Sequence, residues 1–356
     1  MSTIASIEFI PLKLPLDQPL TLKECALEHL YVWVCRVTDT DGCVGEGYTH
    51  HIVTDIGFPI IKNISVQWWP YLIGKDPATI QTMQFHLIQQ IKQNDSKFYY
   101  YFLSAIDIAC WDLWLKRENK SLAAHLHIAP NTTVPVYGSG GWVSYTDDEL
   151  LAECQHYVDL GCKTYKFKLG SFATRDDDRR RIMLLRNHFN DITLCADSNL
   201  EYTLDEACQI ANMLAEFNIQ FFEEPIKNDN TDDLITLSHL TSVPIATGEN
   251  RFCDDQFKAL CVPDSNVRLI QADIVRCGGI SALLRLLDLC EQTGRQFMAH
   301  VNPALSATVI AKNSTISCVE DAKRLFPAKF LVTKQAIRNG AMTLSDEPGV
   351  GVWIIH

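Results

Sequence analysis

From residue 134 onward, short apolar or β-branched runs alternate with longer amphipathic segments, and this alternation most constrains the fold. The short runs are 134–137, 164–169, 192–196, 220–222, 244–246, 268–271, 297–299 and 315–319. Strands that alternate with helices build parallel βαβ units. Eight such units within about 200 residues predict a (β/α)8 barrel of modest size. A doubly wound open sheet is the second possibility, but no Gly-x-Gly-x-x-Gly follows any run.

Ionisable residues stand at the ends of these runs from the second run onward. They are Lys166, Lys168, Asp197, Glu223, Glu249, Asp273, His300 and Glu320. From Lys168 to Glu320 the successive intervals are 29, 26, 26, 24, 27 and 20 residues, about one βα unit each. Because the carboxyl ends of barrel strands meet at one mouth, we expect these side chains to face one another.

Each of these residues also has an ordinary interpretation. A single acid after a strand is more often a helix cap or a turn former than a ligand. Lys166 and Lys168 share one face of a strand, with Tyr165 and Phe167 on the other, which also fits a half-buried strand at a sheet edge. An isolated His300 is more often a core histidine. The succession of all these groups at nearly constant spacing favours a common site.

The residues before 130 predict a smaller α+β unit. Residues 30–37 are rich in β-branched and aromatic side chains and lead into a turn at 38–42, which predicts a hairpin. Between 98 and 115, apolar side chains recur at helical spacing. Pro130 and Pro135 interrupt the chain near the expected boundary with the barrel.

The charge and the cysteines exclude several functions. A net charge of −12 argues against nucleic acid or an anionic membrane as the main partner, although a bound metal allows a small anionic substrate. The 13 cysteines include no Cys-x-x-Cys pair, which predicts reduced thiols in the cytoplasm. The first residues lack a basic segment followed by an apolar one, so we expect no secretory signal. The longest uncharged stretch, 296–311, is too short and polar for a membrane span.

In this order, the motifs resemble the enolase superfamily and, within it, the mandelate racemase subgroup, over essentially the whole chain. At the front, TDTDGCVGEG resembles the Asp-Gly-x-x-Gly-x-Gly hairpin of the family, and SAIDIACWDLWLK resembles its Ala-x-Asp-x-Ala-x-Trp-Asp helix. In the barrel, Lys-x-Lys, ADSN, FFEEP, ATGEN and QADIVRCGGI resemble its successive strand-end motifs. EPGVGV near the end resembles its Pro-Gly-x-Gly tail.

The resemblance implies a modified (β/α)8 barrel with an N-terminal α+β capping domain that the C-terminal segment completes. The expected domains are a capping domain at 1–130, the barrel at 131–325 and a C-terminal segment at 326–356 that packs back on the capping domain. Residues 16–29 and 48–56 resemble two loops that cover the barrel mouth and exclude water. They carry His29, His50 and His51, which we expect to be exposed loop histidines.

The resemblance also implies a magnesium site. Asp197, Glu223 and Glu249 resemble the three ligands of one Mg²⁺ per subunit, and three carboxylates suit a hard, oxygen-seeking cation. The family motif selects Glu223 rather than Glu224, and because adjacent strand residues face opposite ways, only one of the two can point inward. Asn199, two residues beyond Asp197, is expected to touch the metal-bound substrate.

The remaining residues resemble the catalytic set of the family. Lys168 resembles a base on one face of the substrate, with a pKa expected to be lowered by Lys166 and the metal. Lys166 is expected to orient the substrate carboxylate. His300 with Asp273 resembles a dyad on the opposite face, and Glu320 is expected to donate a hydrogen bond to the substrate carboxylate.

Two further residues bear on specificity. Muconate-lactonising and dipeptide-epimerising relatives carry a lysine five residues before the Gly-Gly pair, where this chain has Asp273. The chain therefore resembles the mandelate racemase subgroup more than those relatives. Ser139, at the end of the first run, is a candidate substrate contact, and a turn serine is an equally good interpretation.

The implied reaction is removal of the proton next to a carboxylate, through an enediolate whose charge is stabilised by the metal and nearby cations. Relatives with this residue set are more often acid-sugar dehydratases than racemases, which favours dehydration of an aldonate or aldarate to a 2-keto-3-deoxy acid. Racemisation or epimerisation of a 2-hydroxy acid or related carboxylate is the alternative. A non-catalytic barrel that serves as a binding protein is the alternative from another class, and the intact residue set argues against it. The family habit implies a homo-oligomer.

Overall fold

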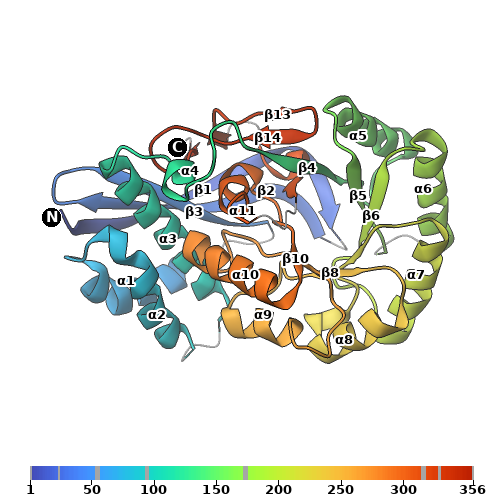
Figure 1. The fold of residues 1–356 in the computed structure, drawn as a ribbon, viewed down its shortest axis with the longest axis horizontal. Coiled ribbons are helices and arrows are strands. Elements are labelled where there is room, and N and C mark those ends of the chain that lie inside the picture. The colour runs from blue at the N-terminus through green and yellow to red at the C-terminus, as the bar shows by residue number, and fades with distance from the viewer. Residues whose placement is uncertain are drawn as a thin grey trace.

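The computed structural model describes residues 2–22, 25–52, 57–92, 96–170, 175–313, 318–327 and 330–354. The chain begins with an antiparallel sheet of the strands β1 (Ile4–Leu22), β2 (Cys25–Asp39) and β3 (Val44–His51). The helices that follow are α1 (Gly57–Leu72), η1 (Pro77–Thr79), α2 (Ile80–Ile91), α3 (Phe98–Arg117) and α4 (Leu122–His125). This capping part lies at the left in Figure 1, beside the barrel.

The hairpin expected around residues 30–44 is confirmed. The backbone turns at Gly42 with φ +84°, a left-handed conformation that glycine adopts without steric cost. Asp39 Oδ1 accepts the backbone N–H groups of Asp41 and Cys43 at 3.0 and 2.8 Å. The side chain of Asp39 therefore holds the turn that joins β2 to β3.

The glycines of the GEG sequence in β3 allow this strand to lie directly against α3. A Cβ atom on Gly47 would stand 2.2 Å from the backbone oxygen of Ala105, and one on Gly45 would stand 2.2 Å from that of Ala109. Because side-chain atoms cannot approach a backbone oxygen so closely, only glycine fits at these two positions. The helix predicted for 98–115 is confirmed as α3, and almost all of its residues are buried.

Two aspartates of α3 join the capping part to the rest of the chain. Asp107 Oδ2 accepts the backbone N–H of Ser281 at 3.0 Å, at the beginning of α10 (Gly279–Thr293). Asp112 Oδ2 accepts the N–H of Glu46 at 2.9 Å, and its Oδ1 accepts the N–H of Val350 at 3.0 Å. The acids in the SAIDIACWD sequence therefore connect the capping sheet, the barrel and the C-terminal segment.

The barrel strands are confirmed at the expected places. They are β4 (Thr133–Gly140), β5 (Thr164–Lys168), β6 (Thr193–Asp197), β7 (Phe222–Glu223), β8 (Ile245–Thr247), β9 (Leu269–Ile270), β10 (Gln296–Phe297) and β11 (Val319–Asp321). Consecutive strands pair in parallel from β4 to β10. Strand β11 pairs with β4, and Ala299 bridges Val319, which closes the cylinder. Residues 314–317, part of the last expected strand, lie outside the described residues.

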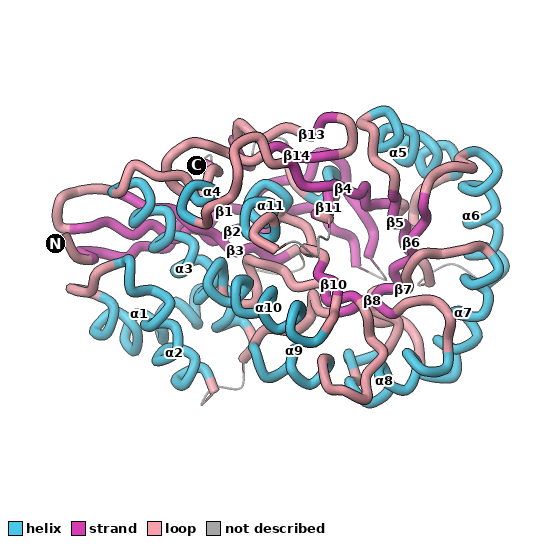
Figure 2. Tube along the Cα trace, in the orientation of Figure 1, coloured by secondary structure: helices cyan, strands magenta, loops and turns pink. Residues whose placement is uncertain are grey.

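The barrel helices lie outside the strands, as Figures 1 and 2 show. They are α5 (Asp147–Asp159), α6 (Arg175–His188), α7 (Leu204–Glu216), α8 (Thr231–Leu240), α9 (Asp254–Leu260), α10 and α11 (Pro303–Ile310), with η2 (Lys227–Asp229) before α8. Thr-x-x-Glu capping boxes begin α5 and α7. After β11, the described residues up to 327 hold only the short η3 (Lys323–Leu325), so the barrel departs from a regular (β/α)8 pattern at its last unit.

The C-terminal segment contacts both parts of the molecule. It contains β12 (Leu331–Val332), β13 (Ile337–Arg338), β14 (Ala341–Thr343) and β15 (Trp353–Ile354). Strand β14 pairs antiparallel with the barrel strand β4. Gly349 forms a bridge with Ser121, just before α4 in the capping part. The contact with the capping part agrees with the expected packing, while the domain boundaries stay predictions.

Side chains fill the interior of the barrel in layers. The alternation of side chains along each strand determines which residues belong to each layer. Tyr137, Cys195, Phe221, Ala246, Leu269 and Met298 form a separate apolar cluster inside the cylinder. Because strand side chains alternate with a period of two, the residue two positions after each of these also points inward. Those positions hold Ser139, Asp197, Glu223, Gly248, Gln271 and His300. A polar layer therefore lies directly above an apolar one, toward the barrel mouth.

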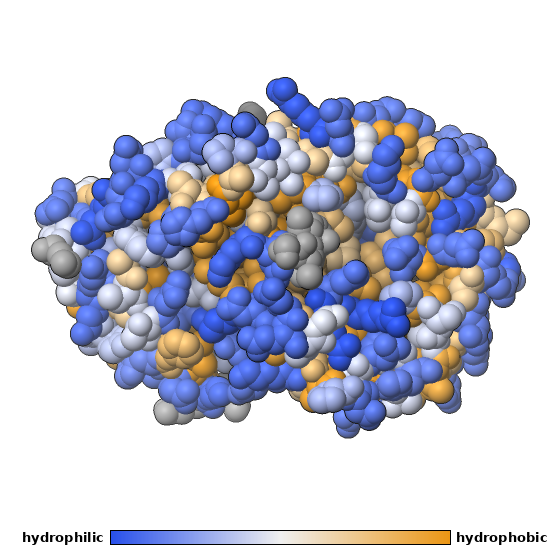
Figure 3. All heavy atoms as spheres, in the orientation of Figure 1, coloured by the Kyte–Doolittle hydropathy of each residue, from blue (hydrophilic) through white to orange (hydrophobic). Residues whose placement is uncertain are grey.

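The face of the molecule in Figure 3 carries mostly hydrophilic side chains, with hydrophobic ones in small groups. This agrees with a chain of net charge −12. Among the described helices, none combines the length and the apolar character that a bilayer span requires.

The contact between β3 and α3 predicts the effect of two alanine substitutions. Gly47→Ala should lower the free energy of unfolding by about 2–3 kcal/mol or more, because the new methyl group overlaps a backbone oxygen. Gly74→Ala is the matched control: its Cβ meets nothing within 4 Å, although its φ of +81° should cost about 1 kcal/mol. Urea unfolding measures both, and equal losses would contradict this account of the GEG sequence.

Candidate active site

A buried cluster of one lysine and three acids occupies the centre of the polar layer. Lys166 Nζ lies 2.5 Å from Glu223 Oε1, 2.9 Å from Glu320 Oε1 and 3.7 Å from Asp197 Oδ2. All four side chains are at most 2% exposed. Burial lowers the pKa of Lys166, but Glu223 and Glu320 outweigh it and raise this pKa well above its usual value. The structure therefore brings together four of the residues that the sequence placed at separate strand ends.

Lys168 lies beside this cluster and also faces the cavity above it. Its ammonium group donates to Asp197 Oδ2 and lies 5.6 Å from the ring centre of Trp142. The sequence predicted a lowered pKa for Lys168. Burial and the charge of Lys166 do lower it, but Asp197 outweighs both, and the pKa is raised. The expectation of a lowered pKa included the charge of a metal ion on Asp197, so it stays a prediction for the metal-bound site.

His300 contacts two carboxylates through its two ring nitrogens. Its Nε2 lies 2.6 Å from Glu249 Oε2, and its Nδ1 lies 3.1 Å from Asp273 Oδ2. Burial lowers the pKa of His300, but these carboxylates outweigh it and raise the pKa to about 10. The expected contact with Asp273 is present, and the contact with Glu249 was not foreseen.

Asp273 is held from behind by residues of both parts of the molecule. Asn302 donates through Nδ2 to Asp273 Oδ1 at 3.2 Å and lies 3.3 Å from Nε2 of His50. The hydroxyl of Tyr48 donates to Asn302 Oδ1 at 2.9 Å. Arg276 Nε lies 3.0 Å from Asp273 Oδ2. Strand β3 of the capping part therefore contacts the His300–Asp273 pair through Asn302.

The three histidines expected in exposed loops belong to strands. His50 is fully buried in β3, and burial lowers its pKa to about 3, so the expectation of an exposed residue is wrong for it. His29 in β2 and His51 in β3 are half-buried. The described residues of 16–29, and residues 48–51, are strand, while 23–24 and 53–56 lie outside the described residues. Alternation along β3 gives the reason, since His50 shares its inward face with Tyr48.

The two adjacent glutamates of FFEEP are both buried but serve different contacts. Glu223 faces the barrel interior, where Gln271 Nε2 donates to its Oε2 at 2.6 Å. Glu224, at φ +47°, accepts from Asn250 Nδ2 at 2.8 Å and from Thr247 Oγ1 at 3.1 Å. Sequence reasoning missed Gln271, although it lies two positions after the inward Leu269 and could have been found by that alternation.

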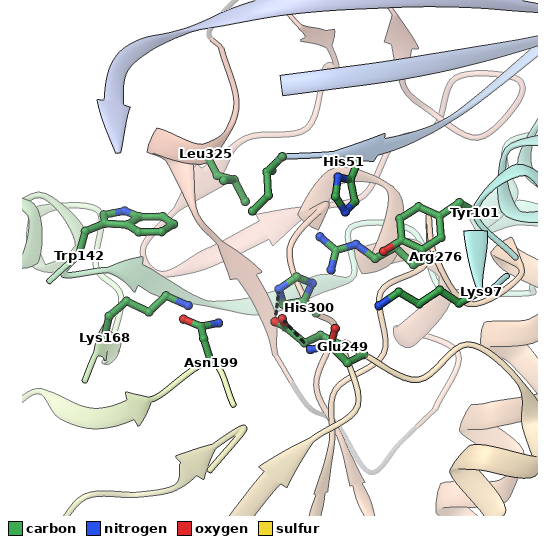
Figure 4. A pocket seen from close by; sticks show the side chains of 12 residues that line it. His51, Lys97, Tyr101, Trp142, Lys168, Asn199, Glu249, Arg276, His300 and Leu325 are labelled. Atoms are coloured by element: carbon green, nitrogen blue, oxygen red, sulfur yellow. Dashed lines mark hydrogen bonds and ion pairs between the residues drawn. The ribbon is translucent and has the colours of Figure 1, made fainter. Parts of the chain in front are cut away.

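Ser139 and Asn199, the two further candidates for contact with the substrate, also lie at this site. Ser139 is buried on β4 and hydrogen-bonds Glu320, so its present contact is a member of the cluster. The backbone N–H of Asn199 donates to Asp197 Oδ1 at 2.9 Å. The side chain of Asn199 lines the cavity beside Lys168 (Figure 4).

The cavity above the polar layer has a volume of about 210 Å³ and lies between the barrel mouth and the capping part. Its barrel wall includes Trp142, Lys168, Asn199, Glu249, Asn250, Arg276 and His300. Its capping wall includes His51, Ile52, Lys97 and Tyr101. In Figure 4, Lys168 and Trp142 enter from one side, Lys97, Tyr101 and Arg276 from the other, and His300 lies between them. Sequence reasoning missed the residues of the capping wall other than His51, and it also missed Trp142, Asn250 and Arg276.

The three carboxylates expected to bind a metal each pair with a cation of the chain. Asp197 contacts Lys168, Glu223 contacts Lys166, and Glu249 contacts His300. Within the described ranges, no three His, Cys, Asp or Glu side chains form a ready metal-binding group. The donors are nevertheless all carboxylate oxygens at the ends of the adjacent strands β6, β7 and β8, which is a suitable set for a hard divalent cation.

Comparison with family models gives two matches. Residues 8–126 match the mandelate racemase / muconate lactonizing enzyme N-terminal domain. Residues 149–355 match the enolase C-terminal domain-like model. The two models together cover most of the capping part, the barrel from residue 149 onward and the C-terminal segment.

Similar proteins cover almost the whole chain. An o-succinylbenzoate synthase from Geobacillus kaustophilus is 30% identical, over 97% of this chain and 93% of that protein. L-talarate/galactarate dehydratase from Salmonella typhimurium is 26% identical, over 97% of this chain and 86% of that protein. The crystal structure of a racemase from Streptomyces coelicolor with bound magnesium has a TM-score of 0.89 at 23% identity, over 99% of this chain and 97% of that one. The last of these likenesses shows the shared fold.

The contact between Tyr48 and Asn302 predicts a loss of stability on its removal. Tyr48→Phe leaves a buried acceptor unpaired and should lower the free energy of unfolding by about 1 kcal/mol. Tyr71→Phe is the control, because the contacts of Tyr71 are made by its ring, which stacks on His86 at 4.0 Å and lies 5.7 Å from Lys75 Nζ, and no change beyond about 0.5 kcal/mol is expected. Thermal or urea unfolding tests this, and an equally large loss for Tyr71→Phe would contradict it.

Proposed function

The chain belongs to the family of mandelate racemases and muconate lactonizing enzymes, and we propose that it is a Mg²⁺-dependent enzyme that removes the proton next to a substrate carboxylate. The substrate that we propose is a sugar acid, which loses water to become a 2-keto-3-deoxy acid. One observation carries this proposal: Lys168 and His300, two groups able to carry a proton, both reach the same cavity, Lys168 from one side and His300 from its centre. A substrate held between them can lose a proton to one and receive a proton from the other.

Asp197, Glu223 and Glu249 are the proposed ligands of the Mg²⁺. Their donor oxygens suit this ion, and the cations that face them show that positive charge is stabilised at this place. When bound, the divalent ion polarises the substrate carboxylate and stabilises the negative charge that develops as the α-proton leaves. The Streptomyces coelicolor racemase of the same fold contains magnesium, which supports the choice of metal.

The proposed dehydration uses two proton transfers. Neutral Lys168 takes the α-proton and becomes an ammonium ion, while the electron pair of the broken C–H bond passes into an enediolate. His300, as the imidazolium, gives its proton to the β-hydroxyl, whose C–O bond breaks so that water leaves. The resulting enol becomes the 2-keto acid. Asp273 holds the imidazole through Nδ1, so that Nε2 faces the cavity side where Glu249 lies.

Lys166, Glu320 and Asn199 are the proposed groups that position the substrate. Lys166 and Glu320 lie at the floor of the site. We propose that Lys166 orients the substrate carboxylate and that Glu320, as the protonated acid in the substrate complex, donates a hydrogen bond to it, with Ser139 beside Glu320. Asn199 lines the cavity between Lys168 and Glu249 (Figure 4). Its amide is therefore placed to contact a hydroxyl of the substrate.

The same enediolate can either lose a β-hydroxyl, which is dehydration, or regain a proton, which is racemisation or epimerisation. The dehydratase relative from Salmonella typhimurium, together with an arabinonate dehydratase of Saccharolobus solfataricus at 27% identity, favours loss of a β-hydroxyl. Racemisation or epimerisation uses the same two groups, Lys168 and His300, at one cavity, so this arrangement supports it as the second candidate. The cysteines support a cytoplasmic enzyme, because all 13 are free thiols and most are buried.

A substrate screen tests the reaction. Six-carbon aldonates and aldarates are incubated with the enzyme and Mg²⁺, and the 2-keto product is trapped with semicarbazide. We expect a ketone from at least one acid, its loss in excess EDTA and its recovery with added Mg²⁺. Deuterium exchange at the α-carbon in D2O without any ketone would favour the racemase instead, and turnover indifferent to chelation would contradict the metal ligands.

Two substitutions test the assigned proton carriers. Lys168→Met and His300→Asn should each lower kcat by about 10²- to 10⁴-fold, because each removes one proton transfer. Lys163→Met is the matched control, since Lys163 is exposed at the start of the same strand, and it should leave kcat unchanged. Circular dichroism and the melting temperature verify that each variant folds. Retention of more than about a tenth of the activity by Lys168→Met would exclude this lysine as the base.

A further inference from the structure

The end of the cavity next to the capping part carries two cations that the proposed reaction does not use. Lys97 directly precedes α3 in the capping part, and Arg276 belongs to the loop between β9 and α10 of the barrel. Both line the cavity, and Figure 4 shows them entering from the same side, with Tyr101 beside them. Lys168 enters the cavity from the opposite side (Figure 4) and contacts the same oxygen of Asp197 as Lys166, which belongs with Glu320 to the buried floor of the site.

Within the described part of the chain, the guanidinium group of Arg276 contacts a carboxylate only through its Nε atom. Its side chain is buried and 9% exposed, and its Nε lies 3.0 Å from Asp273 Oδ2. Its guanidinium carbon lies 5.9 Å from the ring centre of Tyr101. Among the described residues, the two terminal nitrogens of Arg276 have no hydrogen-bond acceptor, and they face the cavity. A planar pair of N–H donors in this geometry suits the two oxygens of a carboxylate.

Lys97 has no carboxylate partner within ion-pair distance among the described residues. Its ammonium group lies 5.2 Å from the ring centre of Phe252 and 5.9 Å from that of Phe98. The pKa of Lys97 is lowered, by burial first and then by the positive charge of Arg276. The fold therefore holds two like charges close enough to repel each other, and an anion bound between them would remove this repulsion.

We propose that Lys97 and Arg276 form a second anion site that binds the far carboxylate of a dicarboxylic substrate, so that the enzyme prefers aldarates to aldonates. This proposal rests on the proposed function for the position of the first carboxylate, at the floor of the site. The far carboxylate accepts two hydrogen bonds from Arg276 and one from Lys97. Because Lys97 belongs to the capping part, the length of substrate that fits is set by the distance between the two parts of the molecule.

A simpler interpretation assigns both cations other tasks. Arg276 would then only hold Asp273 in place beside His300, and Lys97 would be a solvated lysine at the cavity mouth. On this interpretation, loss of Lys97 changes nothing, and loss of Arg276 harms every substrate equally. The second anion site predicts instead an effect that depends on whether the substrate has one carboxylate or two.

The experiment compares galactarate with galactonate, which share a six-carbon chain and differ in the second carboxylate. For the wild-type enzyme we expect kcat/KM and Mg²⁺-dependent binding, measured by calorimetry, to favour galactarate by about tenfold or more. Lys97→Met should lower both quantities for galactarate by about tenfold, mainly through KM, and leave those for galactonate within about twofold. Lys92→Met is the matched control, because Lys92 pairs with Asp255 on the surface, and it should change neither.

Arg276→Met is the second substitution to be compared on galactarate and galactonate. It should weaken the binding of galactarate more than that of galactonate, in addition to any loss of kcat that both substrates share through Asp273. The proposal is overturned if the wild type binds galactonate as tightly as galactarate, if no six-carbon diacid binds with Mg²⁺, or if Lys97→Met keeps the preference. The binding measurement separates this outcome from failure of the proposed reaction, since a diacid preference in binding does not require that any ketone forms.

Discussion

The structure depends on the pairing of buried carboxylates with cations and hydrogen-bond donors inside the barrel mouth. Asp197, Glu223 and Glu320 lie within reach of one buried ammonium group, that of Lys166. Carboxylates removed from water are strongly destabilised unless cations and hydrogen bonds surround them. Every acid of the polar layer accordingly has a cation or an amide donor of the chain against it. This need explains why lysines, acids and a histidine occur together at these strand ends.

The same compensation makes the site suitable for catalysis. In the function that we propose, these acids exchange part of this positive charge for a divalent ion, and Lys168 and His300 are then available to the substrate. The apolar layer of Tyr137, Phe221 and Met298 below closes the barrel to water from that side. Charges that face the cavity therefore act in a medium of low polarity, where they influence a developing negative charge more strongly than they would in water.

The capping part completes the site in two ways. It supports the catalytic pair from behind, since Tyr48 of β3 holds Asn302, which holds Asp273. It also forms one wall of the cavity through Lys97 and Tyr101. Both β3, which packs against α3, and the wall residues near the start of α3 are held in place, because the aspartates of α3 fix it to the barrel helix α10 and to the C-terminal segment. The shape of the cavity and the position of the proposed His300–Asp273 dyad therefore depend on the same contact between the two parts.

The amino-acid sequence by itself determined the barrel and the order of the ionisable groups around its mouth. Both follow from local periodicity, because parallel strands that alternate with helices bring their carboxyl ends to one place. It also indicated the carboxylates at Asp197, Glu223 and Glu249, since each ends a short apolar run. Only the tertiary structure decided which cation faces which acid, that His50 is buried, and that Lys97 and Arg276 share one end of the cavity. These relations join residues far apart in the chain, and packing between the two parts, which leaves no period in the sequence, brings them together.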